Sequence, residues 1–282
     1  MPMLTIQNEC LKVTVSTLGA ELQRVTDASG ERLFDGDPAF WPNHAPVLFP
    51  YAGGLVDNAF TYKGVTYPAK TKHGFARRAE FRVESQSESS VTLLTDEPNE
   101  EYPFEYAFRV RYELEGAALK ISYISRNTSA SEPMIFGCGC HEALACPGGI
   151  EGCKVVFGRP YTLRHYRLDG AQIVREPEII AENTDTLELK YDYFTVDALV
   201  FRDLNCPSLT LQRPDGHGVQ LECADFAHLL IWTKPGAPYI CLEPWTNPPE
   251  WVGASQELTQ KSGMMTLQPG EEDTRVHTLR FF

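Results

Sequence analysis

The chain has 282 residues, of which 43% are hydrophobic and 22% are charged. These fractions are typical of a folded globular protein and exclude collagen-like, coiled-coil and disordered chains. With 25 Lys and Arg residues against 38 Asp and Glu residues, the net charge is −13. Phosphate backbones and anionic lipids repel an acidic protein, so the composition disfavours binding to nucleic acid or to a membrane surface. The expected ligand is a neutral small molecule.

The N-terminal residues Met1-Pro-Met-Leu-Thr5 lack the basic and apolar segments of a secretion signal. No apolar run approaches the roughly 20 residues that cross a bilayer. We therefore expect a cytoplasmic protein whose eight cysteines stay reduced. The cluster Cys138-Gly-Cys140-His141 has residue types that bind zinc, but no second ligand pair follows at finger-like spacing. We interpret these thiols as small buried side chains and expect no metal.

In chain order, the predicted elements are strands. Apolar and polar residues alternate at period two in 11–15, 104–112, 119–124, 209–212, 219–223 and 276–281. Hairpin turn signals lie at 28–30, 115–116 and 214–216. The only helical pattern is a short one at 257–261, and 157–186 has the charge and weak pattern of a surface excursion. The sequence predicts an all-β protein of mostly antiparallel strands, in a single domain over residues 1–282.

Glu243 is the first candidate for catalysis. It follows the apolar run Tyr239–Leu242 and precedes Pro244 and Trp245. A carboxylate beside a buried strand loses hydration, which raises its pKa toward that of a general base. An ordinary structural Glu that pairs with Arg or caps the backbone is the alternative.

Two histidines are further candidates, because each adjoins glycine in an apolar setting. His73 precedes Gly74, and His141 follows the thin predicted strand Gly137–Cys140. Glycine beside a histidine lets a ligand approach the backbone closely. A structural role remains the ordinary one for a single histidine. Several aromatic residues would also suit a sugar, whose C–H faces stack on rings: Trp41, Phe75, Trp232, Trp245 and Trp251.

Seven segments, taken together and in order, resemble the aldose 1-epimerase (galactose mutarotase-like) family, especially its branch often encoded with lactose and galactose genes. They are Trp41, Ala45-Pro-Val-Leu-Phe-Pro50, His73-Gly-Phe-Ala-Arg77, Gly137-Cys-Gly-Cys-His141, Val196-Asp-Ala-Leu199, Ile231-Trp-Thr-Lys234 and Leu242-Glu-Pro-Trp245. The resemblance spans about residues 4–270. It implies a β-supersandwich with an open sugar-binding cleft, and neither a metal nor an organic cofactor.

The resemblance also implies roles for individual residues. Glu243 would be the general base, His141 the acid that protonates the ring oxygen, and His73 a ligand of sugar hydroxyls. Asp197 would bind hydroxyls on the far side, although its surroundings in the sequence do not single it out. The expected sugar-binding set is completed by residues of the same motifs: Phe75, Arg77, Glu142 and Trp245.

Two departures from the family pattern concern this site. Gly53-Gly54 stands where the branch commonly has Gly-Arg, and Glu142 stands where it usually has Pro. Loss of a cation and gain of an anion predict a raised imidazolium pKa at a nearby histidine. We expect Gly54 to make room for a bulkier or differently charged ligand. The alternatives are a weakened site, or a backbone that needs positive φ at this position.

The expected reaction is the interconversion of the α and β anomers of an aldohexose or a derivative, by a monomer or weak dimer. A non-catalytic sugar sensor with the same fold is the main alternative, because of the missing arginine. An epimerase for a modified or phosphorylated sugar would need cations, and Lys72, Arg77 and Arg78 form the only obvious cationic cluster near a motif. A glycoside hydrolase would need two carboxylates, for which Glu142 and Glu243 are candidates.

Overall fold

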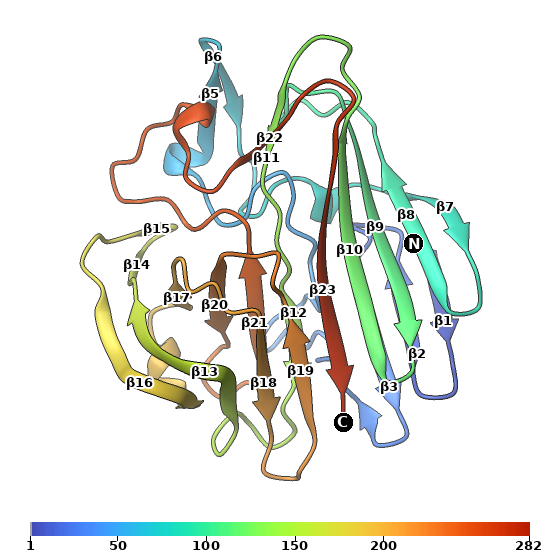
Figure 1. Cartoon of the computed structure of the whole chain (residues 1–282), viewed down its shortest axis with the longest axis vertical. Helices are drawn as coiled ribbons and strands as arrows, with labels where there is room; N and C mark the ends of the chain where they lie inside the picture. Colours follow the sequence, from blue (N-terminus) through green and yellow to red (C-terminus); the bar gives the residue numbers. More distant parts are fainter. Residues whose placement is uncertain (1) are drawn as a thin grey trace.

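The computed structural model describes residues 2–282 and is built almost entirely of antiparallel strands (Figure 1). Its largest layer is a nine-stranded sheet in the order β16-β13-β18-β19-β23-β10-β9-β8-β7. In that order, its strands are Glu178–Glu188, Lys154–His165, Ser208–Gln212, Gly218–Glu222, Glu272–Phe281, Ala118–Asn127, Tyr106–Glu115, Ser90–Thr95 and Arg82–Gln86. The only helices among the described residues are four short 3₁₀ turns, η1 to η4, at Val56–Asn58, Ala76–Arg78, Tyr191–Phe194 and Leu258–Gln260.

The strands predicted from period-two alternation are confirmed. They correspond to β2, β9, β10, β18, β19 and β23, and the short predicted helix corresponds to η4. The three predicted turns connect β3 to β4, β9 to β10 and β18 to β19. In β9 the even-numbered side chains from Tyr106 to Leu114 are buried, because one face of the strand packs on the core while the other faces solvent.

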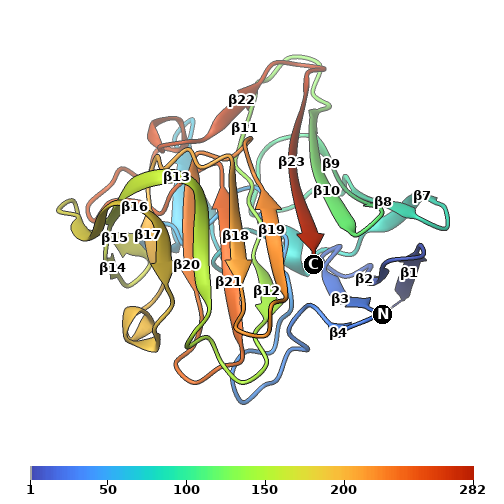
Figure 2. The ribbon, with the colours of Figure 1, turned by 60° about the horizontal axis from the view of Figure 1, so that its bottom comes forward.

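A second, four-stranded sheet faces the first, in the order β12-β21-β20-β17. Its strands are Glu142–Ala145, Tyr239–Trp245, His228–Trp232 and Leu199–Phe201. Figure 2 shows β12 and β21 behind β18 and β19. Ile240 and Leu242 of β21 belong to the main hydrophobic core, whereas Trp245 belongs to a smaller apolar cluster on the opposite face of the strand. Every residue of β21 is buried, so this strand lies between the core and a second covered layer.

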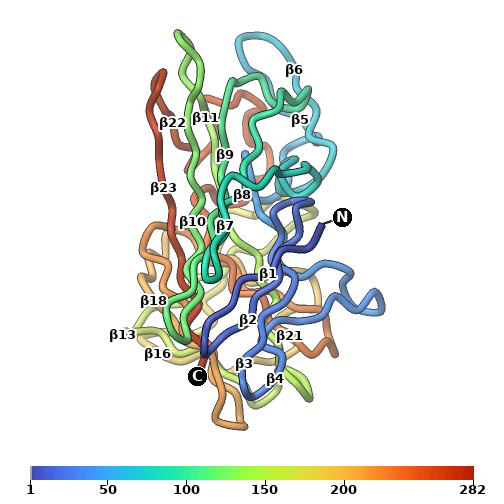
Figure 3. Tube along the Cα trace, turned by 90° about the vertical axis from the view of Figure 1, so that its right-hand side faces the viewer, coloured from blue at the N-terminus to red at the C-terminus, as the bar shows by residue number. Residues whose placement is uncertain are grey.

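The N-terminal sheet has the order β1-β2-β3-β4, with strands Met3–Gln7, Lys12–Ser16, Leu22–Asp27 and Gly30–Glu31. It lies beside β7 and β8, as Figure 3 shows in blue and teal. The Gln7 N–H donates to the Glu88 carbonyl at 2.7 Å and connects the two sheets. Two further hairpins and one long-range strand pair complete the fold: β5–β6 (Ala59–Tyr62, Val65–Pro68), β14–β15 (Leu168–Asp169, Gln172–Ile173) and β11–β22 (Met134–Phe136, Met265–Leu267).

The segment 157–186 is more regular than its sequence suggests. Instead of a surface excursion it forms most of β13 and β16, at one edge of the large sheet, and the β14–β15 hairpin between them. Edge strands expose both faces and carry charge, which weakens the period-two pattern. Within residues 2–282 no helix has the length and apolar character needed to cross a membrane.

Candidate active site

A pocket of about 290 Å³ opens on the face of the four-stranded sheet that points away from the large sheet. Its polar lining consists of Lys72, His73, Arg77, His141, Asp197 and Glu243. Three indoles, those of Trp41, Trp232 and Trp245, provide aromatic faces. Aromatic faces beside a few convergent polar groups are typical of sites that bind small polyhydroxylated ligands. The structure therefore brings together six of the eight predicted site residues: Glu243, His141, His73, Asp197, Arg77 and Trp245.

Glu243 lines the pocket from the small sheet. It is a residue of β21, paired with Leu230 of β20, and its side chain is 2% exposed. Its Oε1 has no hydrogen-bond partner among the described residues. Burial, and to a lesser degree the charges of Asp197 and Glu142, raise the pKa of the Glu243 carboxyl well above its usual range. The carboxyl therefore binds a proton readily.

His141 is the neighbour of Glu243 in the pocket. It lies one residue before β12, and its Nε2 is 3.4 Å from Glu243 Oε2. The ring stacks on Trp41 with centroids 4.8 Å apart and meets the edge of Trp232 at 5.7 Å. Burial, followed by the charge of Arg77, lowers the pKa of His141 to about 3. The shifts of Glu243 and His141 both favour the uncharged forms of the two side chains.

This result corrects the expectation of a raised imidazolium pKa. Glu142 does favour the charged imidazole of His141, but burial and Arg77 outweigh it. Although position 54 has no arginine, a cation still faces the histidine, because Arg77 lines the same pocket.

His73 is held by Gly53 through two hydrogen bonds. The His73 N–H donates to the Gly53 carbonyl at 2.7 Å, and the Gly53 N–H donates to His73 Nδ1 at 3.1 Å. Since Nδ1 accepts, the proton of the neutral ring is on Nε2, where it can serve as a donor. Burial, and then the charge of His141, lower the pKa of His73 well below its usual range. The ring lies edge-on to His141 and Trp245, with centroids 5.5 and 5.4 Å away.

Asp197 and two cations line the wall of the pocket. Asp197 lies between η3 and β17, and Lys72 Nζ is 3.9 Å from its Oδ2. Arg77 Nη2 donates to Asn43 Oδ1 at 3.3 Å. Among residues 2–282 no carboxylate is within ion-pairing distance of Arg77. Lys72 and Arg77 therefore place positive charge beside the pocket, and hydrogen-bond donors that a hydroxyl or an anionic substituent could use.

Trp245 forms another wall, and its position explains the glycines before His141. The indole Nε1–H donates to the Cys140 carbonyl at 3.3 Å. A Cβ added to Gly139 would lie 2.6 Å from Trp245 Cδ1, and one added to Gly137 would lie 2.2 Å from Asn247 Oδ1. These glycines admit protein side chains, and the expectation that they admit a ligand was wrong. The predicted strand 137–140 is an irregular extended segment, bridged at Gly139 to Leu48 and Trp245.

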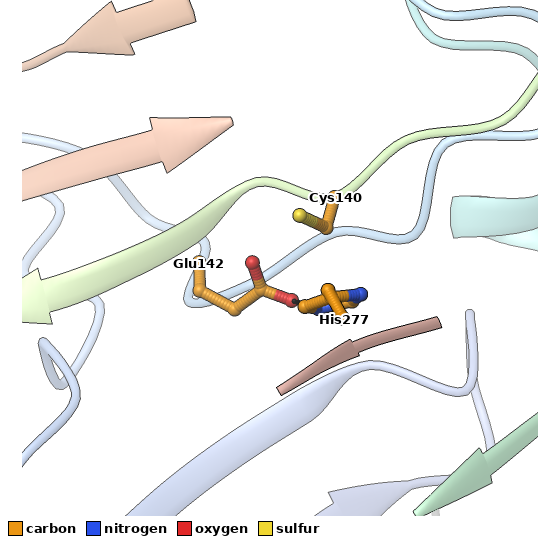
Figure 4. Close-up of side chains that lie close together, drawn as sticks. All are labelled: Cys140, Glu142 and His277. Carbon is orange, nitrogen blue, oxygen red and sulfur yellow. Dashed lines mark hydrogen bonds and ion pairs between the residues drawn. The ribbon is translucent and has the colours of Figure 1, made fainter. Parts of the chain in front are cut away.

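Phe75 and Glu142 lie outside the pocket, which corrects their predicted role in sugar binding. Phe75 is 2% exposed and packs against Phe49 and Tyr102 in the main core. The Glu142 carboxylate points toward the large sheet, where its Oε1 is 2.8 Å from His277 Nε2 (Figure 4). Successive residues of a strand face opposite sides, so His141 and Glu142 cannot both face the pocket. For the same reason, Glu142 cannot be the second carboxylate of a hydrolase.

Gly54 faces part of the β14–β15 hairpin. Its φ is not in the positive region, unlike that of Gly53, which is +80°. A Cβ added to Gly54 would lie 2.5 Å from the Cβ of Ala171. The expected room for a bulkier ligand at this position is therefore occupied by Ala171.

Two pocket residues from this hairpin, Leu168 and Ala171, were not predicted from the sequence, because no local signal places the hairpin over the site. Leu230 was not predicted either, because it resembles an ordinary core residue.

Within residues 2–282, two sets of three buried side chains have the composition of metal ligands. One is Cys140, Glu142 and His277, between the two sheets, and the other is His141, Cys241 and Glu243, at the pocket floor. Thiolate, imidazole and carboxylate are all donors that zinc accepts.

The fold and the site define a class of β-supersandwich proteins with an aromatic-lined pocket above the smaller sheet. Two crystal structures are similar over the whole chain. One is a galactose mutarotase related enzyme from Lactobacillus acidophilus, with TM-score 0.93 and 31% identity, covering 100% of this chain and 97% of that one. The other is a galactose mutarotase-like protein from Lactobacillus casei, with TM-score 0.91 and 27% identity, covering both chains fully.

Sequence comparison leads to the same class. The family model of aldose 1-epimerase matches residues 2–278. The chromosomal protein LacX of Lactococcus lactis subsp. lactis is 32% identical over 266 residues, covering 86% of this chain and 87% of that protein. The chain therefore belongs to the aldose 1-epimerase family. The predicted resemblance, including its lactose-associated branch, and the predicted β-supersandwich fold are confirmed.

Proposed function

We propose that this protein interconverts the α and β anomers of an aldohexose by acid–base opening of the sugar ring. The observation that carries the proposal is the buried pair of Glu243 and His141, whose Oε2 and Nε2 are 3.4 Å apart in a pocket lined by aromatic rings. Anomer interconversion needs one group that removes a proton and one that supplies a proton, on two oxygens bonded to the same carbon. A pair that shares one proton provides both.

In the proposed reaction Glu243 is the base and His141 the acid. Hydroxyls that donate to a carboxylate favour its charged form, so a bound sugar shifts the shared proton from Glu243 to His141. Glu243 then removes the proton of the anomeric hydroxyl, and the O1–H electron pair forms the C1–O1 double bond. The C1–O5 bond breaks toward O5, which takes a proton from His141 Nε2. Rotation about C1–C2 and the reverse steps on the other carbonyl face give the opposite anomer.

The other polar residues are proposed to hold the sugar. The Nε2–H of His73 faces a hydroxyl, because its Nδ1 already accepts from Gly53. Asp197 accepts from hydroxyls on the far side, and Arg77 and Lys72 donate. Each positioned acid or base contributes about 10²–10⁴-fold to such a reaction. Polarimetry or NMR exchange on freshly dissolved galactose and glucose tests the proposal. Equilibration no faster than in buffer would support the sugar-sensor alternative instead.

A substrate with an anionic substituent is the second candidate, because Arg77 faces the pocket with no ion-pairing carboxylate among the described residues, and Lys72 lies nearby. A phosphate or uronate group would find two cations there. The acidic net charge of the chain argues against anionic substrates at long range. Comparing kcat/KM for glucose, glucuronate and glucose 6-phosphate distinguishes the two. A preference of tenfold or more for an anionic sugar would select the second candidate.

A further inference from the structure

A cysteine lies directly beneath the catalytic pair. Cys241 precedes Glu243 by two residues on β21 and is fully buried. Donor atoms of Cys241, Glu243 and His141 all lie within 4.8 Å of one another. We propose that these three side chains bind one thiophilic divalent cation, such as Zn²⁺, and that its binding competes with the sugar reaction. The competition rests on the proposed function, whereas the metal site itself does not.

The geometry of the three side chains suits a tetrahedral site. Residues two apart on a strand face the same side, so Cys241 and Glu243 both point away from the large sheet. His141 joins them from the position just before β12, the neighbouring strand, in which Ala143 pairs with Cys241. Bonds of about 2.0–2.1 Å from zinc to nitrogen and oxygen give a tetrahedral edge of about 3.3 Å. The distance of 3.4 Å between His141 Nε2 and Glu243 Oε2 matches this edge.

The site has an entry path and an open fourth position. His141 and Glu243 line the pocket, whereas Cys241 does not line it and is fully buried. A metal bound to all three would direct its remaining coordination position into the pocket, as zinc sites with three protein ligands and one water do. Glu243 Oε1 is buried and has no hydrogen-bond partner among the described residues, so the carboxylate retains capacity to bind a cation.

The second cluster has the same residue types but lacks these properties. The carboxylate of Glu142 is already hydrogen-bonded to His277 at 2.8 Å, and Cys140 lies next to them between the sheets (Figure 4). His277 is 1% exposed and Cys140 is 0% exposed. Neither residue lines the pocket above the small sheet. This cluster therefore serves as a matched control for the site at Cys241.

A metal in the proposed site would occupy the atoms that the proposed reaction uses. It would take the lone pair of a His141 ring nitrogen and a carboxylate oxygen of Glu243, and it would displace to solvent the thiol proton of Cys241 and any proton on the Glu243 carboxyl. Neither proton transfer could then take place. Zn²⁺ is therefore expected to inhibit, and a chelator to restore activity, with no oxidation or reduction involved.

The direct test is a titration of the metal-free protein with Co²⁺, followed by absorption spectroscopy. A thiolate ligand produces a charge-transfer band in the near ultraviolet, and tetrahedral geometry produces intense visible bands. We expect both in the native protein and in Cys140→Ser, and at least a tenfold loss of affinity together with loss of the charge-transfer band in Cys241→Ser. His141→Asn is the second test, because it removes a different ligand. The proposal would be overturned if Cys241→Ser and His141→Asn both kept the native Co²⁺ spectrum. It would also be overturned if Cys140→Ser lost the charge-transfer band.

Competition is tested separately, by mutarotation assays with Zn²⁺ and then EDTA. Each variant is compared with its own metal-free rate. We expect inhibition in the native protein and in Cys140→Ser, reversal by EDTA, and at least tenfold weaker inhibition in Cys241→Ser. Metal bound through Cys241 without inhibition would refute the competition. If the native protein has no mutarotase activity, the proposed function fails, and the Co²⁺ spectra still decide the metal site.

Discussion

Ala171 lies against Gly54, so close that a Cβ added to Gly54 would be 2.5 Å from the Cβ of Ala171. Ala171 belongs to the β14–β15 hairpin, and Gly54 belongs to the segment that leads into η1. The pairing fills the space into which an arginine at position 54 would project. Ala171 and Gly54 both line the pocket.

This contact predicts the effect of substitutions at position 54. Gly54→Ala and Gly54→Arg are expected to lower the free energy of unfolding by about 1–3 kcal/mol, the ordinary cost of overpacking. Ala171→Gly should restore most of the loss in Gly54→Ala, giving a non-additive double-mutant cycle in denaturant. Gly158→Ala is the control, since the nearest atom to its added Cβ is 3.7 Å away. A Gly54→Arg protein of native stability that binds hexose more tightly would contradict this view.

Glu243→Gln tests the proposed base. The amide retains the shape of the side chain but accepts no proton, so anomer interconversion should fall at least a hundredfold while the circular dichroism spectrum stays native. Glu222→Gln, on the exposed side of β19, is the control and should retain full activity. Activity of Glu243→Gln within twofold of the native protein would remove Glu243 from the mechanism.

The same substitution should stabilise the fold, relative to the native protein, as the pH rises above 4.5. Burial raises the folded-state pKa of Glu243 above the ordinary value of 4.5. The folded state therefore binds more protons than the unfolded state, and stability is lost as pH rises from that value through the folded-state pKa. Glutamine does not ionise, so the variant loses no stability in this way as the pH rises. The difference in free energy of unfolding between the variant and the native protein should increase with pH, by at most about 1.4 kcal/mol per unit. A pH-independent difference between pH 5 and 9 would be evidence against a raised pKa.

The two pocket histidines should differ in their kinetic effects. His141→Asn is expected to lower kcat with little change in KM, because protonation of the ring oxygen develops only in the transition state. His73→Asn should also raise KM, because His73 holds the bound sugar through Nε2. Steady-state kinetics on the preferred hexose measures both. A change in KM alone for both variants would assign the acid role to water or another group.

Glu142→Ala should affect stability rather than sugar binding. Burial alone would raise the pKa of the Glu142 carboxyl, but its hydrogen-bonded neighbour His277 brings it below its usual value. Removing one member of such a buried pair typically costs about 3–5 kcal/mol of folding free energy. KM should stay within about twofold of native, because the side chain faces the large sheet. Calorimetry and sugar titrations check the two effects, and a large rise in KM at native stability would return Glu142 to the binding site.

The sequence by itself determined the strands and the most chemically conspicuous residues. Period-two alternation is a local property, so β9, β10 and their turn could be predicted from the residues alone. The buried character of Glu243 followed from the apolar run before it. Its partner His141 could be predicted from its glycine neighbours, although those glycines accommodate the side chains of Trp245 and Asn247 rather than a ligand.

Only the tertiary structure decided which of these residues meet. Phe75 and Glu142 adjoin pocket residues in the chain, yet both face the core, because the side on which a strand or turn is covered depends on distant segments. The hairpin at Ala171 comes from a segment with weak pattern, and it reaches Gly54 only through the packing of edge strands. Burial and neighbouring charge set the pKa values of Glu243 and His141, and neither quantity exists before the chain has folded.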